Sequence, residues 1–116
     1  MGEPRERFPR ASRLRRSREF QRVARLGQRM TTEHFIVLLM RSDPNRSANL
    51  PRLGVTVSKR VGNAVVRNRV KRGIREWFRR SRVSLAPQGD LVVIARQGAA
   101  KLGAREISLE LSEVLS

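Results

Sequence analysis

Cysteine and tyrosine are absent from this 116-residue chain, and histidine and tryptophan occur once each. Without cysteine, the chain can form neither a disulfide framework nor a thiolate zinc site. The single histidine, His34, leaves no histidine pair for the general acid–base chemistry that many protein nucleases use. These absences exclude the small scaffolds that rely on disulfides or zinc, and they argue against a histidine-pair nuclease.

Acidic residues and long apolar runs are also scarce. Ten acids stand against 26 basic residues, a formal net charge of +16. The longest apolar run, residues 35–40, is strand-sized and far shorter than the roughly 18 residues of a membrane span. The N-terminus lacks the apolar region of a secretory signal. We therefore expect one soluble, cytoplasmic domain whose charge requires an anionic partner, either nucleic acid or an anionic membrane surface.

Residues 59–80 contain nine basic side chains and a single acid, Glu76. On a helix, Val66, Val70, Ile74 and Trp77 fall on one side. The opposite side carries Arg67, Asn68, Lys71, Arg72, Arg75 and Arg79. An ordinary solvated helix face would intersperse acids that pair with these cations, and Glu76 can serve only one or two neighbours. The pattern therefore predicts a helix with a buried apolar stripe and a polyanion-binding outer face.

The remaining pattern predicts a basic, flexible arm over residues 1–16 and a short helix from Ser17 to Gly27. Strands are expected over 32–41, 53–58 and 90–96, the central helix from about 63–66 to 80–82, and a last helix over 101–115. The order α-β-β-α-β-α predicts a two-layer α/β (α+β) sandwich that forms a single domain over 1–116. The strands that flank the central helix are expected to pair in parallel. Gly73, inside that helix, is expected to allow close helix–sheet packing.

Charge is unevenly distributed along the chain. Residues 1–30 and 59–82 hold ten basic side chains each, whereas residues 90–116 hold three basic residues against four acids. This partition indicates a defined binding surface. The acids are scattered, and neither a nucleophile elbow nor a Walker-type phosphate loop is present. His34, beside an apolar strand, is interpreted as structural. We therefore predict no catalytic residue and no metal ligand in the protein itself.

A long motif then indicates a family. The segment from Gly54 to Glu76, with Arg67-Asn68-Arg69 at its centre, resembles the signature of the bacterial ribonuclease P protein subunit. Similarity to its N-terminus is carried by residues 8–9, 13–14 and 17–20, and similarity to its last strand by residues 91–96. The resemblance implies a left-handed βαβ crossover around the basic helix, against the usual hand. It also implies a catalytic RNA that removes the 5′ leader of precursor tRNA, with Mg²⁺ held mainly by that RNA.

Matched positions assign two binding surfaces. The family's catalytic-RNA contacts fall on Lys59, Arg60, Arg67, Asn68, Arg69, Lys71, Arg72 and Arg75. The leader is expected in a cleft between the first helix and the sheet, where the resemblance assigns Phe20, Phe35 and Leu38. Leu38 and Ala24 stand where the family often has aromatic residues, so charge is expected to carry more of leader binding than stacking does. Neither a membrane nor an obligate protein partner is expected.

Three alternatives compete with this interpretation. A general basic protein, ribosomal or DNA-compacting, would bind many nucleic acids with similar affinity and would not alter cleavage. A protein-only nuclease would use His34 and scattered acids, and it would cleave without an RNA partner. A helix-turn-helix reader is less favoured, because strands flank the basic helix where that motif needs another helix.

Overall fold

The computed structural model describes residues 21, 23, 25, 27–40, 52–85 and 90–115, without the side chains of 82–85 and 115. Residues 21, 23 and 25 are helical, and the amide of Gly27 donates to the carbonyl of Val23 at 2.8 Å where this helix ends. The elements that follow are β1 (Gln28–Thr31), β2 (Phe35–Met40), β3 (Leu53–Thr56), α2 (Ala64–Leu85), β4 (Asp90–Ala95), the 3-10 helix η2 (Gln97–Lys101) and α3 (Ala104–Leu115). The predicted basic arm over 1–16, the helix cap at Ser17, Phe20 and the side chain of Ala24 lie outside the described residues.

The four strands form one sheet in the order β1-β2-β4-β3. β1 pairs with β2 and β2 with β4 in antiparallel fashion, whereas β3 pairs with β4 in parallel, with Leu53 opposite Leu91. Because α2 connects β3 to β4, the predicted parallel pairing across the central helix is confirmed. The left-handed sense of this crossover stays a prediction from the resemblance.

Strand β1 was missed by the sequence prediction, which placed no strand between the first helix and residue 32. Gln28, Arg29 and Thr31 are exposed, and only Met30 is half-buried. An edge strand with so little burial shows no apolar alternation, so the pattern gave no signal. The mixed α/β class is confirmed, and the sheet has one strand more than predicted.

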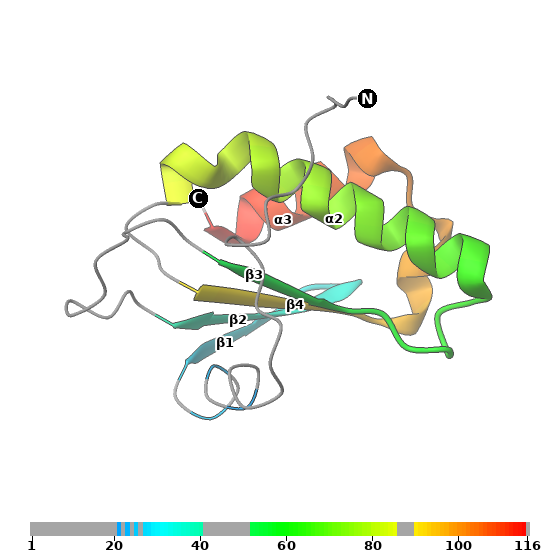
Figure 1. Cartoon of the computed structure of the whole chain (residues 1–116), viewed down its shortest axis with the longest axis horizontal. Coiled ribbons are helices and arrows are strands. Elements are labelled where there is room, and N and C mark those ends of the chain that lie inside the picture. Colours follow the sequence, from blue (N-terminus) through cyan, green and yellow to red (C-terminus); the bar gives the residue numbers. More distant parts are fainter. Residues whose placement is uncertain are drawn as a thin grey trace, which may run out of the picture.

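Helices α2 and α3 cover one face of the sheet (Figure 1). The core between the layers contains Phe35, Val93, Ile74, Phe78 and Leu111, all fully buried. The other sheet face carries a second, smaller cluster of Val23, Leu38 and Val92. β2 and β4 are thus covered on both faces, which explains their nearly continuous apolar sequences.

Two helix boundaries and one packing prediction need correction. α2 extends to Leu85, beyond the predicted end, and α3 begins at Ala104 because η2 occupies Gln97–Lys101. Gly73 does permit a close approach, but to the neighbouring helix rather than to the sheet. A methyl group on Gly73 would lie 2.7 Å from Ile107 Cδ1 and 3.8 Å from the Cα of Ala104. The glycine therefore lets α2 and α3 approach each other.

Candidate nucleic-acid interface

The turn that precedes α2 is held by its own hydrogen bonds. The amide of Val61 donates to the carbonyl of Ser58 at 3.1 Å. Asn63 caps the helix, because its side-chain Oδ1 accepts from the amide of Val66 at 2.9 Å. Lys59 and Arg60 are exposed in this turn, so both cations are presented at the N-terminal end of α2.

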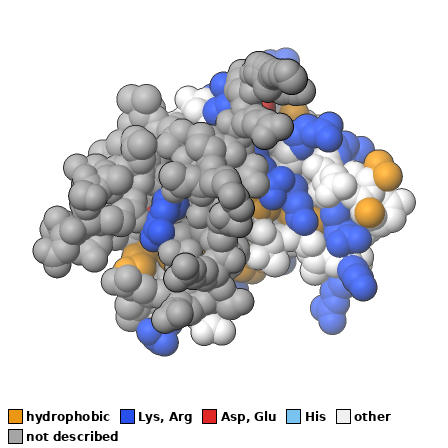
Figure 2. Space-filling model, in the orientation of Figure 1, with side chains coloured by type: hydrophobic (Ala, Val, Ile, Leu, Met, Phe, Trp, Pro, Cys, Tyr) orange, Lys and Arg blue, Asp and Glu red, His pale blue; other side chains and the backbone are white. Residues whose placement is uncertain are grey.

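The helix itself divides as predicted. Val70, Ile74 and Trp77 are buried, and the Trp77 Nε1 donates to Ser112 Oγ of α3 at 3.0 Å. The outer side holds exposed and half-buried polar residues, which together with the turn we call the basic surface. Its members are Lys59, Arg60, Arg67, Asn68, Arg69, Lys71, Arg72 and Arg75. The structure thus places all eight predicted RNA-contact residues in the turn and at exposed or half-buried positions of α2. Figure 2 shows Lys and Arg side chains gathered on the side of the molecule where α2 begins.

Two arginines of the basic surface are tethered to backbone carbonyls. Arg67 Nε donates to the carbonyl of Gly62 at 3.2 Å, and Arg69 Nη2 donates to the carbonyl of Ala100 in η2. A guanidinium has five N–H donors, so each arginine keeps donors for a phosphate. Because the tethers already restrict these side chains, less conformational entropy is lost on binding.

The one acid within α2 is neutralised at the far end of the basic surface. Glu76 bonds Arg79, and its carboxylate lies 3.5 Å from Arg80 Nε. The hydrogen bond from Arg79, with smaller contributions from the charges of Arg79 and Arg80, lowers the pKa of Glu76 despite partial burial. As predicted, Glu76 serves only near neighbours along its own helix.

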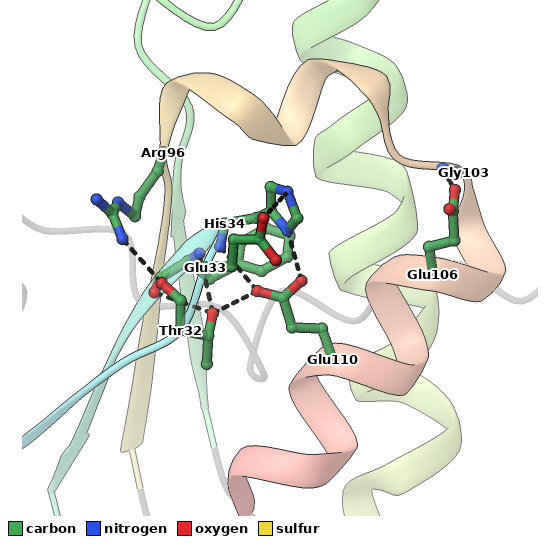
Figure 3. A network of polar contacts seen from close by, with 8 residues as sticks. Thr32, Glu33, His34, Arg96, Gly103, Glu106 and Glu110 are labelled. Carbon is green, nitrogen blue, oxygen red and sulfur yellow. Dashed lines mark hydrogen bonds and ion pairs between the residues drawn. The ribbon is translucent and has the colours of Figure 1, made fainter.

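His34 belongs to a polar network that joins the β1–β2 turn to α3 (Figure 3). Its Nδ1 lies 2.7 Å from Glu110 Oε1, and its backbone amide donates to Glu110 Oε2 at 2.8 Å. Thr32 Oγ1 donates to the same carboxylate, and Arg96 donates to the carbonyl of Thr32 at 2.9 Å. Burial raises the pKa of Glu110, but the hydrogen bonds from Thr32 and His34 outweigh it and lower the pKa below its usual value.

This network supports a structural role for His34 and corrects one expectation about α3. Glu110 was expected to lie outside with Glu106 and Glu113, yet its carboxylate is largely enclosed by residues of the β1–β2 turn.

Among the described residues, no three His, Cys, Asp or Glu side chains are placed to share a metal ion. Nor is any helix in that part of the chain long and apolar enough to cross a membrane.

The proposed leader-binding residues separate in the structure. Phe35 is fully buried in the core beneath the helices, so its ring offers no face to a base, and its assignment to the leader site is wrong. Leu38 lies on the opposite sheet face, 6% exposed, against Val23. Phe20 is outside the described residues.

The sheet face around Leu38 also carries side chains that the sequence interpretation missed. Ile36, Met40 and Ile94 are half-buried against the cluster of Val23, Leu38 and Val92. The signal was available, since Ile36 and Met40 stand two residues either side of Leu38 and must share its face of the strand. This sheet face is therefore aliphatic where it meets the first helix.

Comparison with known proteins decides the family. Residues 8–116 match the family model described as Ribonuclease P. This chain belongs to the ribonuclease P protein family. The ribonuclease P protein component of Syntrophobacter fumaroxidans is 47% identical over 108 residues, covering 90% of this chain and 86% of that protein. That of Desulforapulum autotrophicum is 39% identical, with 92% and 88% covered.

Solved ribonuclease P proteins share the fold. The Staphylococcus aureus RNase P protein superposes with a TM-score of 0.80 at 36% identity, covering 91% of this chain and 94% of that one. The Thermotoga maritima RNase P protein gives a TM-score of 0.74 at 31% identity, with 89% and 94% covered. The similarity in sequence and in fold extends over nearly the whole ribonuclease P protein, well beyond the motif of the basic helix.

Proposed function

We propose that this protein binds the catalytic RNA of ribonuclease P through the basic surface and the 5′ leader of precursor tRNA beside the aliphatic sheet face. Family membership makes it the protein subunit of the ribonuclease P holoenzyme, which matures the 5′ end of tRNA. The observation that supports the RNA contact is that all eight matched residues lie in one turn and at exposed or half-buried positions of the helix that follows it. In this proposal the protein works in the cytoplasm, where it meets both RNAs.

The basic surface would act by neutralising phosphates. Exposed Arg69 and Arg72 and half-buried Arg67 can each donate two hydrogen bonds to a phosphate, and Lys59 and Arg60 add charge at the helix start. If about six phosphates are neutralised, the logarithm of the binding constant should fall with the logarithm of salt concentration at a slope of about −4 to −5. Screening of this kind lets a polyanionic substrate approach a polyanionic RNA.

The leader would pass along the face that carries Leu38. Aliphatic side chains there offer contact area without base stacking, so nearby charge is expected to contribute most of the affinity. Exposed Arg29 lies on this face, because it pairs with Leu38 across the strands and shares its side of the sheet, and exposed Arg25 belongs to the helix whose Val23 packs there. Binding of this type is expected to be largely independent of leader sequence.

The hydrolysis itself is assigned to the RNA, which would hold most of the Mg²⁺ that the reaction needs. On the protein side, the ring Nδ1 of His34 is occupied by Glu110, and the histidine is buried. Such a side chain positions α3 against the β1–β2 turn. The proposal therefore gives the protein an RNA-positioning role and no proton-transfer step.

A three-part cleavage assay tests the proposal. Precursor tRNA would be incubated at near-physiological Mg²⁺ with the protein alone, with a bacterial ribonuclease P RNA alone, and with both. Cleavage at the mature 5′ end is expected only in the mixture. A mixture no faster than RNA alone, together with equal binding of unrelated RNA and DNA, would replace the proposal with a general basic binder. Cleavage by protein alone would indicate a protein nuclease.

A further inference from the structure

The segment 97–105 lies directly beside the middle of α2. Arg69 donates to the carbonyl of Ala100, and Gly73 brings the Cα of Ala104 to within 3.8 Å of where a methyl group would stand. Ala99 and Leu102 are buried on either side of Lys101. Lys101 is therefore an exposed cation on a segment that Ala99 and Leu102 fix to the core.

Helix α3 has two flanks of different charge. Ala104 and Ser112 face α2, since one lies against Gly73 and the other accepts from Trp77. Arg105 is exposed and stands seven residues before Ser112, two helical turns, so it lies on the same flank. Glu106, Glu110 and Glu113 lie on the other flank, where Glu110 bonds Thr32 and His34. Figure 3 shows Glu110 reaching toward Thr32 and His34, and Glu106 accepting a hydrogen bond from the amide of Gly103 just before α3.

We propose that Lys101 and Arg105 extend the basic surface, so that the catalytic-RNA interface crosses from α2 over η2 to the first turn of α3. This inference rests on the proposed function and adds two contact residues outside the matched motif. The partner is the phosphate backbone of the catalytic RNA, which Lys101 and Arg105 would bind next to Arg69 and Arg72. The acidic flank of α3 marks the edge of the interface, because Glu106 and Glu113 repel a phosphate backbone.

The geometry favours a shared backbone contact for these four residues. Arg69 is already bonded to the backbone one residue before Lys101, so the two cations extend from neighbouring points. Arg72 lies one helical turn after Arg69 on the exposed side of α2. The step from Arg69 to Arg72 runs in the same direction as the chain of α3. RNA phosphates spaced along one strand can therefore be met by successive cations from two adjacent elements.

The test compares the double variant Lys101→Ala/Arg105→Ala with a control of equal charge, Arg25→Ala/Arg29→Ala. The control residues are exposed near the other face of the sheet, where the proposed function assigns them to the leader, and this assay contains no leader. Affinity for ribonuclease P RNA without substrate would be measured by filter binding over a series of salt concentrations. The first variant is expected to bind about tenfold more weakly at physiological salt, with a salt slope shallower by about 2, and the control is expected to match the wild type.

Equal affinity losses in both doubles, or an unchanged salt slope in the first, would overturn the inference. Arg67→Ala/Arg69→Ala, measured in parallel, separates this failure from failure of the proposed function. If that variant loses affinity and Lys101→Ala/Arg105→Ala does not, the interface is confined to the turn and α2. If neither loses affinity, the proposed function falls too. Circular dichroism melts would establish that all variants are folded.

Discussion

Helices α2 and α3 lie side by side on the same sheet and share one core, but they present opposite charges to solvent. The outer face of α2 carries the basic surface, whereas the flank of α3 away from α2 exposes Glu106 and Glu113 to solvent and turns Glu110 toward the β1–β2 turn. Packing requires only that each helix bury an apolar stripe, which Ile74 and Phe78 supply in α2 and Ile107 and Leu111 in α3. Because packing does not determine which charges the outer faces of the two helices carry, we attribute these charges to function.

The largest effect is expected when arginines of the basic surface on α2 are replaced. Arg67→Ala/Arg69→Ala should weaken binding to ribonuclease P RNA about 100-fold, because each arginine contributes charge-assisted hydrogen bonds of about 1.5 kcal/mol. Fluorescence titration at physiological salt checks this. Arg67→Lys/Arg69→Lys is the matched control and should lose less, because it retains both charges. Unchanged affinity in the alanine variant would contradict the comparison, provided that the protein remains folded.

The next effect concerns the acidic side, where Glu110 is expected to serve folding. Glu110→Gln removes a charged acceptor of bonds from Thr32 and His34 and should lower the free energy of unfolding by about 2 kcal/mol. RNA affinity at pH 7 should stay the same. Urea unfolding and RNA titration of one preparation measure both, and Glu113→Gln serves as the control on the same flank. A loss of RNA affinity in folded Glu110→Gln would mean that Glu110 of α3 also supports RNA binding, which would contradict the separate roles of the two helices.

The same carboxylate predicts a pH dependence. The folded protein lowers the pKa of Glu110, so its stabilising contribution is fully present above the unfolded value of 4.5 and is lost as pH falls through the folded-state pKa. Unfolding free energy should therefore drop below about pH 4.5 more steeply in the wild type than in Glu110→Gln. If the unfolding free energy falls with pH equally in the two proteins, the network does not stabilise the ionised form of Glu110.

A smaller effect is expected when the acidic flank is reversed. Glu106→Lys/Glu113→Lys removes two negative charges and adds two positive ones, so binding to unrelated RNA should tighten about tenfold at low salt and its salt dependence should steepen. Competition between ribonuclease P RNA and unrelated RNA measures the lost selectivity. The neutral variant Glu106→Gln/Glu113→Gln should give an intermediate result. Unaltered selectivity would mean that this flank does not limit the interface.

The smallest effect is expected where the two helices touch. Ser112→Ala leaves the Trp77 Nε1 without its acceptor and should cost about 1 kcal/mol of unfolding free energy, with RNA affinity unchanged. Thermal unfolding followed by tryptophan fluorescence is a direct readout, because Trp77 is the single tryptophan. Ser108→Ala is the control on the same flank of α3 and should cost less.

The sequence was most informative where local periodicity and burial agree. The start of α2, its apolar stripe and its basic face were predicted correctly, because Val66, Val70, Ile74 and Trp77 repeat at the helical period. β2 and β4 were found as apolar runs. β1 was missed because an exposed edge strand such as Gln28–Thr31 carries almost no apolar signal.

The rest depended on contacts between residues far apart in the chain. Periodicity could not show that Gly73 meets Ile107, or that Glu110 closes on Thr32 and His34 some 76 residues away. Phe35 and Leu38 stand three residues apart in one apolar run, so strand alternation already puts them on opposite faces, and only the tertiary structure shows which of the two faces α2 and α3 cover. The eight residues of the basic surface were predictable since they lie within one short stretch of sequence.

In the chain, α2 connects two strands that are neighbours in the sheet, and this connection affects how the protein unfolds. β3 and β4 are hydrogen-bonded to each other, and the chain between them is the helix that binds RNA. Peeling α2 away would expose Phe35 and Val93 to water, so the helix cannot unfold without the rest of the domain. Backbone amides from Val70 to Phe78 should therefore exchange with solvent only through global opening, and RNA that binds only the folded protein should slow their exchange by a factor of 1 + [RNA]/Kd, where [RNA] is the free RNA concentration.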